Sequence, residues 1–81
     1  MIKINIKCFS HVKYALKVDK LELEMPQGST LKTLEKKIRD MANGGLDGIS
    51  LRMALNKKYT VDDIVLKEGD EVAFIPPVQG G

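Results

Sequence analysis

The sequence predicts an α+β fold in which one amphipathic helix covers one face of a mixed sheet. Three observations support this fold class. Apolar and polar residues alternate near both ends of the chain, with the period of a strand that has one buried face. A single stretch near the middle carries apolar residues at helical spacing. At 81 residues, the chain has room for one domain with one core.

The first predicted strand covers residues 2–9. Its apolar phase consists of Ile2, Ile4, Ile6 and Cys8. Phe9 falls in the opposite phase, so we expect its side chain on the other face of the sheet. A short helical turn over residues 10–16, capped by Ser10, follows. A second strand is expected where apolar residues alternate with glutamates, at Leu21, Leu23 and Met25.

A helix comes next, and Ser29 or Thr30 can cap its unpaired amide groups. Its apolar face is formed by Leu31, Leu34, Ile38 and Met41. The outer face is charged, and Glu35 and Arg39 have the spacing of an i,i+4 ion pair. Residues 43–45, Asn-Gly-Gly, should end the helix, because glycine tolerates the left-handed conformation at helix ends.

The remaining strands follow the helix. Apolar alternation over residues 49–55 predicts the third strand. Residues 56–58 turn the chain into a short strand over residues 59–61. After a turn at residues 67–70, the final strand covers residues 71–75.

For this order of elements, the simplest fold is a ubiquitin-like β-grasp with four or five strands. One helix covers only one face of the sheet, so the opposite face meets water or a partner. Val72 and Phe74 share the core phase of the last strand, which places Ile75 outside. Because the first and last strands are neighbours in a β-grasp, Phe9 and Ile75 predict an apolar patch on the open face. The alternative is that Phe9 ends its strand and folds over the edge of the core.

Composition and charge argue against several classes of function. The chain is 43% hydrophobic and 30% charged, and its net charge of +2 is spread along the sequence, which argues against nucleic-acid binding. No apolar run resembles a membrane span or a signal peptide, so we expect a cytoplasmic protein with no membrane partner. The single cysteine, Cys8, can form no internal disulfide and cannot supply the several thiolates of a zinc or iron–sulfur site. We therefore expect no bound metal.

The end of the chain predicts a tail that leaves the domain. Pro76 and Pro77 fix φ and donate no backbone hydrogen bond, so they stop the final strand. Residues 78–81 offer little apolar surface, and we expect a flexible tail after a domain of residues 1–77. Glycine has no Cβ and can enter a narrow channel in a partner, carrying the terminal carboxylate with it. A carboxylate becomes reactive when a partner converts it to an acyl adenylate.

The segment GDEVAFIPPVQGG, residues 69–81, resembles the end of the small, sulfur-carrying subunits of molybdopterin synthase in the MoaD/ThiS ubiquitin-like family. The resemblance extends through Ala-Leu-Asn at residues 54–56 and to the opening strand, so it covers most of the chain. The middle of the chain matches only in pattern. Two positions depart from the family, Ile75 where relatives often carry an aromatic residue and Tyr59 where an aliphatic residue is expected.

The resemblance implies a cycle of sulfur transfer. An adenylating enzyme of the ubiquitin-activating type would use ATP and magnesium to form an acyl adenylate on Gly81, and sulfur from a cysteine desulfurase would convert it to a thiocarboxylate. The carrier, in a complex of two small and two large subunits, would insert Gly80 and Gly81 into the large synthase subunit. There the sulfur would attack a cyclic pyranopterin monophosphate, and the large subunit would supply the catalytic acids and bases.

The resemblance also implies a set of docking residues, and no cofactor bound to this chain. The expected docking residues are Phe9, Tyr59, Phe74, Ile75, Pro76, Pro77, Val78 and Gln79. Strand phase places Phe74 in the core, so its docking role conflicts with the alternation.

Several other residues have a functional interpretation and a plainer one. Cys8 could carry a persulfide, but it continues an apolar phase and is expected to be a small buried hydrophobe. His11 has no Cys or His at ligand spacing and is expected in a loop. Asp62 and Asp63 are expected to cap a turn or a short helix. The two lysines at 57–58 could contact an acidic partner, and a solvated turn explains them equally well.

Two alternative functions remain open from the sequence. The first is a thiocarboxylate donor for thiamine or another sulfurated product, or a protein modifier joined to lysines through Gly81. The second is a β-grasp binding module whose terminus is inert. Deletion of Gly80 and Gly81 would leave only this second function intact.

Overall fold

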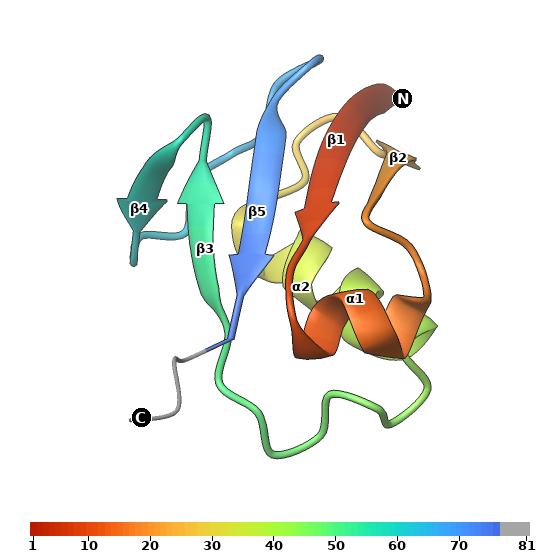
Figure 1. The fold of residues 1–81 in the computed structure, drawn as a ribbon. Coiled ribbons are helices and arrows are strands. Elements are labelled where there is room, and N and C mark those ends of the chain that lie inside the picture. The colour runs from red at the N-terminus through yellow and green to blue at the C-terminus, as the bar shows by residue number, and fades with distance from the viewer. Residues whose placement is uncertain (77–81) are drawn as a thin grey trace.

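The computed structural model describes residues 1–76 (Figure 1). Its elements, in chain order, are β1 Ile2–Cys8, α1 His11–Leu16, β2 Lys20–Met25, α2 Leu31–Met41, β3 Arg52–Leu55, β4 Lys58–Thr60 and β5 Glu71–Ile75. The described strands form one five-stranded sheet in the order β2-β1-β5-β3-β4. β1 and β5 are parallel, and the other neighbours are antiparallel. The predicted mixed sheet is confirmed.

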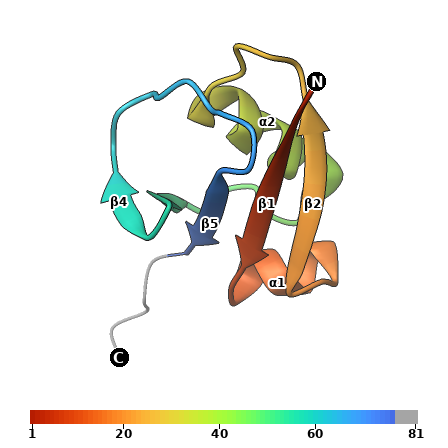
Figure 2. The ribbon, with the colours of Figure 1, turned by 90° about the horizontal axis from the view of Figure 1, so that it is seen from above.

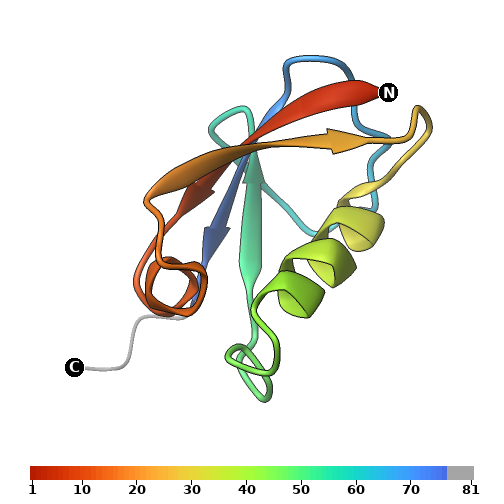
Figure 3. The same cartoon turned by 90° about the vertical axis from the view of Figure 1, so that its right-hand side faces the viewer.

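One main helix covers one face of this sheet. Figure 2 shows the strands from above, and Figure 3 shows α2 lying along one side of the sheet. The three apolar residues Leu31, Leu34 and Ile38 of α2 are fully buried in the same cluster as Val72 and Phe74 of β5. The fold is therefore the predicted ubiquitin-like β-grasp, and the opposite face of the sheet carries no helix among the described residues.

The central pair of strands has the predicted alternation. Ile6 is the partner of Val72, and Cys8 is the partner of Phe74, so these four side chains share the helix-covered face. Both Val72 and Phe74 are 0% exposed. The register therefore confirms that the first and last strands are neighbours, and it places the intervening residues on the open face.

The start of α2 is capped from two sides. The Thr33 amide donates to Oγ1 of Thr30 at 3.4 Å, which confirms Thr30 as the capping residue. The Lys32 amide donates to Oδ1 of Asp63 at 2.9 Å. Asp63 thus helps to cap the main helix, and not the turn or short helix that was expected. The other candidate cap, Ser29, is buried and its hydroxyl donates to the Pro26 carbonyl.

The end of α2 differs from the prediction at one residue. Met41 is 42% exposed, so its assignment to the buried face is wrong. Ala42, four residues after Ile38, continues the buried stripe, and Leu46 fills the core beyond it. Gly44 has a positive φ, which confirms that this segment ends the helix.

Three further predictions differ from the structure, namely two strand boundaries and one helix cap. The third strand begins at Arg52 instead of residue 49, because the preceding segment folds into successive turns. The fourth strand is shifted by one residue, to Lys58–Thr60. Ser10 does not cap α1 through its side chain, since its φ of 51° is not the extended conformation of a capping residue. Its place is taken by a backbone bond from the Val12 amide to the Phe9 carbonyl.

Within residues 1–76, none of the helices has the length and apolar character required to cross a membrane. The predicted boundary between a domain of residues 1–77 and a tail of residues 78–81 lies outside the described residues, as does the predicted flexibility of that tail.

Candidate functional site

The candidate site is an apolar patch on the open face of the sheet, beside the end of β5. Ala73 has Ala54 as its partner on β3, and Ala54 has Tyr59 as its partner on β4. Because directly paired residues point to the same face, these side chains lie opposite α2. Ile75 is two residues after Ala73 and shares this face. Continuing the pairing of β1 with β5 by one residue brings Phe9 beside Ile75.

We call this group of residues, which is Phe9, Ala54, Tyr59, Ala73 and Ile75, the open-face patch. Phe9 is 46% exposed and Tyr59 is 67% exposed. Ile75 is half-buried. β1 ends at Cys8, one residue before Phe9, and Phe9 is not part of the core cluster, which favours its predicted place outside the core. The open-face patch offers an apolar surface where the chain leaves the sheet.

The other residues predicted to dock divide into two groups. Phe74 is fully buried on the face opposite the open-face patch, so it cannot present a side chain at the surface, and we remove it from the docking set. Pro76 is also buried in the folded chain. The remaining predicted residues lie outside the described part of the chain: Pro77, Val78, Gln79, Gly80 and Gly81.

The Tyr59 side chain is positioned by a tight hairpin between β3 and β4. Asn56 and Lys57 have φ values of 51° and 73°, and together they form the two-residue loop between the paired residues Leu55 and Lys58. Two positive φ values in a two-residue hairpin loop are the signature of a type I′ turn, in which asparagine is favoured. The predicted turn is confirmed, and both lysines after Asn56 are exposed.

Asn56 also ties this hairpin to the start of β5. The backbone amide of Asn56 donates to the Glu71 carbonyl at 2.8 Å, and its side-chain Oδ1 accepts from the Glu71 backbone amide at 2.9 Å. Its Nδ2 donates to Oδ1 of Asp70 at 3.1 Å. These bonds fix the hairpin against the strand that leads to the C-terminus. The sequence motif Ala-Leu-Asn marked this position, but it did not show which strand the asparagine binds.

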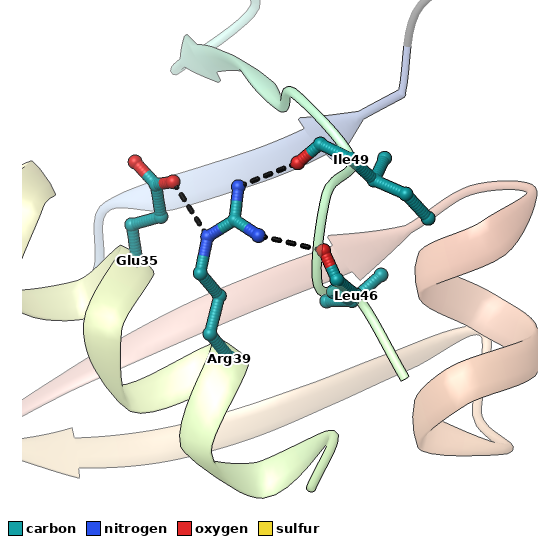
Figure 4. A network of polar contacts seen from close by, with 4 residues as sticks. All are labelled: Glu35, Arg39, Leu46 and Ile49. Carbon is teal, nitrogen blue, oxygen red and sulfur yellow. Dashed lines mark hydrogen bonds and ion pairs between the residues drawn. The ribbon is translucent and has the colours of Figure 1, made fainter. Parts of the chain in front are cut away.

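A second device holds the loop before β3, and the sequence predicted only part of it (Figure 4). Nε of Arg39 lies 2.9 Å from Oε2 of Glu35, which confirms the predicted ion pair. The same guanidinium donates to the Leu46 carbonyl at 2.8 Å and to the Ile49 carbonyl at 2.7 Å. Arg39 therefore makes contacts beyond the outer face of α2. It ties the helix to the chain segment that enters β3.

Around the open-face patch, the open face of the sheet is polar. Nζ of Lys7 on β1 lies 3.4 Å from Oε2 of Glu71 on β5, and both side chains remain partly exposed. Such an ion pair contributes little to stability. Arg52, the Cα partner of Ile75, is exposed at the border of the open-face patch. The patch is thus an apolar area with basic residues at its edge.

The other candidate residues have structural positions. Cys8 is 4% exposed, and burial raises the pKa of its thiol, with a smaller contribution from the charge of Asp19. A buried thiol of raised pKa is a poor nucleophile, so the plain interpretation of Cys8 is confirmed. His11 begins α1 instead of lying in a loop, and it is exposed. Asp62 is exposed, and its own amide donates to Oγ1 of Thr60.

Among residues 1–76, no group of three or more His, Cys, Asp or Glu side chains is arranged to hold a metal ion. The reactive group of the predicted cycle would have to come from the end of the chain.

Comparison with known proteins assigns the family. The family model described as the ThiS family matches residues 6–81. The chain belongs to the ThiS family. A protein of Arabidopsis thaliana named molybdopterin synthase sulfur carrier subunit is 32% identical over 81 residues, which cover 99% of this chain and 84% of that protein. A protein of the same name from Mycobacterium tuberculosis is 34% identical over 83 residues, covering all of both chains.

Solved structures share the fold. Subunit 1 of a molybdopterin converting factor from Pyrococcus furiosus superimposes with a TM-score of 0.86 at 26% identity, covering 96% of this chain and all of that one. The small archaeal modifier protein SAMP1 from Haloferax volcanii gives a TM-score of 0.80 at 17% identity, over 98% of this chain and 99% of that one, which shows likeness of fold only. A complex of subunits 1 and 2 of the molybdopterin-converting factor from Helicobacter pylori contains a similar chain, with a TM-score of 0.68 and 24% identity over 99% of this chain and 100% of that one.

Proposed function

We propose that this chain is the sulfur carrier and small subunit of molybdopterin synthase. The observation that carries the proposal is its similarity, over almost the whole chain, to two proteins with that name. The placement of the exposed open-face patch beside the strand that leads to Gly80 and Gly81 supports it, because a carrier must dock its body while its terminus reaches a partner's site.

The proposed chemistry takes place at Gly81. In the adenylating enzyme, a carboxylate oxygen of Gly81 attacks the α-phosphate of ATP, which is held with magnesium, and pyrophosphate leaves. A persulfide formed by the cysteine desulfurase then attacks the acyl carbon and AMP leaves, and a thiol cleaves the resulting acyl disulfide, so that the terminus becomes a thiocarboxylate and the thiol is oxidised to a disulfide. In the large synthase subunit, the thiocarboxylate sulfur attacks a cyclic pyranopterin monophosphate, and water then cleaves the acyl–sulfur bond, which leaves the sulfur on the pterin and returns the Gly81 carboxylate. Neither ATP nor magnesium is bound by this chain itself in the proposed cycle.

The chain's own residues have two tasks in this proposal. Phe9, Tyr59 and Ile75 bury apolar surface against the partner, which supplies binding energy in proportion to the area removed from water. Gly80 and Gly81 give the clearance that a narrow channel requires, because they have no Cβ. The acids and bases of the reaction belong to the large subunit, in an assembly of two small and two large subunits.

A mass measurement and a reconstitution test this proposal together. The chain is co-produced with its adenylating enzyme, and the intact mass is compared with that of a variant lacking Gly80 and Gly81. An oxygen-for-sulfur shift in the C-terminal peptide of the full chain is expected. The sulfurated chain, mixed with the large subunit and the cyclic pyranopterin, should then form molybdopterin.

Different outcomes separate the alternatives. A sulfurated terminus that gives no molybdopterin with an active large subunit would indicate a donor for thiamine or another product. Linkage of Gly81 to lysines of other proteins would indicate a modifier. An unmodified terminus, with an adenylating enzyme shown to be active, would favour a binding module. Lys37→Ala, an exposed change on α2, is the matched control and should behave as the unaltered chain.

A further inference from the structure

Arg52 occupies the border of the open-face patch at the point where the chain leaves the sheet. It is the first residue of β3, and its Cα partner is Ile75, the last residue of β5. Directly paired residues share a face, so the register directs Arg52 to the open face with Ile75 and Ala54. The side chain is exposed, while Ala54 is only 7% exposed. A guanidinium therefore stands beside an apolar surface.

The charges of this face are not equivalent. Lys7 has a described partner, since its Nζ lies 3.4 Å from the Glu71 carboxylate. Within residues 1–76, Arg52 takes part in no ion pair and its side chain makes no hydrogen bond. Arg52 is thus a cation at the apolar end of the face that makes no ion pair within residues 1–76, although it lines the same hollow as the carboxylates of Glu35, Asp62 and Asp63.

The backbone around Arg52 is held in place from two directions. β5 pairs with β3 on one side, and the Arg39 guanidinium binds the carbonyl of Ile49, three residues before Arg52 (Figure 4). A side chain on a fixed backbone retains its position when the partner arrives, so less ordering accompanies the formation of a new contact. The fixed position of Arg52 on the backbone therefore suits a residue that helps to select the binding partner.

Docking on the open-face patch would remove water from around Arg52. A desolvated cation without a counter-charge is unfavourable, whereas a carboxylate that meets the planar guanidinium with two hydrogen bonds compensates for the lost hydration. Arginine suits such a pair better than lysine, because its donors form a fixed fork. The partner's surface must therefore offer an acidic side chain opposite Arg52.

A small anion is a poorer candidate for this contact. If the five residues from Pro77 to Gly81 enter a narrow channel in extended form, they span about 17 Å. The reacting terminus would then lie well beyond the reach of Arg52. The counter-charge is expected on the partner protein at the mouth of the channel, and not on the phosphate of a substrate.

We propose that Arg52 is a specificity residue of the open-face patch and pairs with an Asp or Glu side chain of the large synthase subunit. This inference rests on the proposed function. Complementary charge across an interface chiefly controls the rate of association and the choice of partner. Loss of the pair should therefore weaken binding and reduce its dependence on salt.

Binding of the chain to the large synthase subunit of the same organism tests the proposal. Dissociation constants are measured over a series of salt concentrations for the unaltered chain, Arg52→Met, Arg52→Lys and Arg52→Glu. Lys37→Glu is the matched control, because it makes the same charge reversal at an exposed site on α2, away from the open face. Thermal unfolding verifies that each variant is folded.

We expect Arg52→Met to weaken binding about fivefold to twentyfold at low salt and to flatten the salt dependence. Arg52→Glu should weaken it further, Arg52→Lys should weaken it less than Arg52→Met, and Lys37→Glu should change it less than about twofold. Reversal of the opposing acidic residue of the large subunit to lysine should restore binding of Arg52→Glu.

Two results overturn the proposal in distinguishable ways. In the first result, the unaltered chain binds, and Arg52→Glu binds with the affinity of the unaltered chain or of Lys37→Glu. The proposed role of Arg52 is then wrong, while the proposed function stands. If the unaltered chain itself does not bind the large subunit, the proposed function fails and this inference fails with it.

Discussion

Replacing Arg39 by methionine removes the bonds that tie α2 to the loop before β3, and its cost follows from the structure. The guanidinium donates to two carbonyls, those of Leu46 and Ile49, and its side chain is 29% exposed. A hydrogen bond from a charged group contributes about 1.5–3 kcal/mol when well buried, and we take about 1 kcal/mol for each of these partly exposed bonds. With about 0.3–0.5 kcal/mol for the helical pair with Glu35, Arg39→Met should lower the free energy of unfolding by about 2–2.5 kcal/mol.

Urea unfolding followed by far-ultraviolet circular dichroism measures this change. For a domain of this size, m is about 1 kcal/mol/M, so the midpoint should fall by about 2 M. The Tm should fall by about 8–20 °C. Glu35→Gln removes only the ion pair and should cost about 0.5 kcal/mol. Arg39→Lys keeps the charge without the fork and should lie between these two variants.

The matched control is Lys36→Met, which makes a cation-to-methionine change at an exposed site on the same helix. This variant should stay within about 0.5 kcal/mol of the unaltered chain. If Arg39→Met proves no less stable than Lys36→Met, the two carbonyl bonds do not hold the loop. If Glu35→Gln loses as much as Arg39→Met, the ion pair and not the carbonyl bonds carries the effect.

Three further predictions concern the core, the hairpin and the buried thiol. Phe74→Ala should cost about 3–5 kcal/mol because it empties a fully buried site, whereas Ile75→Ala on the open face should cost about 1 kcal/mol; equal midpoints in urea would contradict this assignment of faces. Lys57→Gly should raise the free energy of unfolding by about 0.5–1 kcal/mol, because Lys57 has a φ of 73° that glycine adopts without strain. Asn56→Gly should lower it through lost hydrogen bonds, and a lower Tm for Lys57→Gly would argue against the type I′ turn. Burial raises the pKa of the Cys8 thiol, so the contribution of the protonated thiol to stability should be fully present below the ordinary thiol pKa and be lost as the pH rises through the folded-state pKa. Unfolding at a series of pH values should show that the free energy of unfolding declines less at alkaline pH for Cys8→Ala than for the unaltered chain. An equal decline in the two proteins would contradict this prediction.

Local patterns determined the faces of the strands and the position of the main helix. Side chains alternate across a strand with a period of two, so the opposite placement of Phe74 and Ile75 followed from their adjacency. The same argument placed Phe9 outside the core. The turn after β3 and the end of α2 were also predicted, because asparagine and glycine favour turns and helix ends, but the type I′ geometry with Lys57 at a positive φ was not.

Contacts between distant segments could be decided only by the tertiary structure. Asp63 caps α2 across 31 residues, and Asn56 bridges to Asp70 across 14 residues. The Arg39 fork reaches carbonyls 7 and 10 residues away. Sequence spacing predicts only those contacts that helix or strand geometry brings together, such as the pair of Arg39 with Glu35.

The candidate site shows the same division between sequence and structure. The sequence by itself determined the apolar character of Phe9, Tyr59 and Ile75, and it is the source of the chemistry that we propose for the Gly-Gly ending. It also carried the family likeness that the comparisons confirmed. Tertiary structure alone decided that Tyr59 belongs to the open-face patch and that Arg52 lies at its border. Strand pairing across β5, β3 and β4 brings residues 52–60 beside residues 71–75, which are distant in the chain. Local periodicity fixes which way a side chain points, and only the packing of the whole chain fixes which side chain lies beside it.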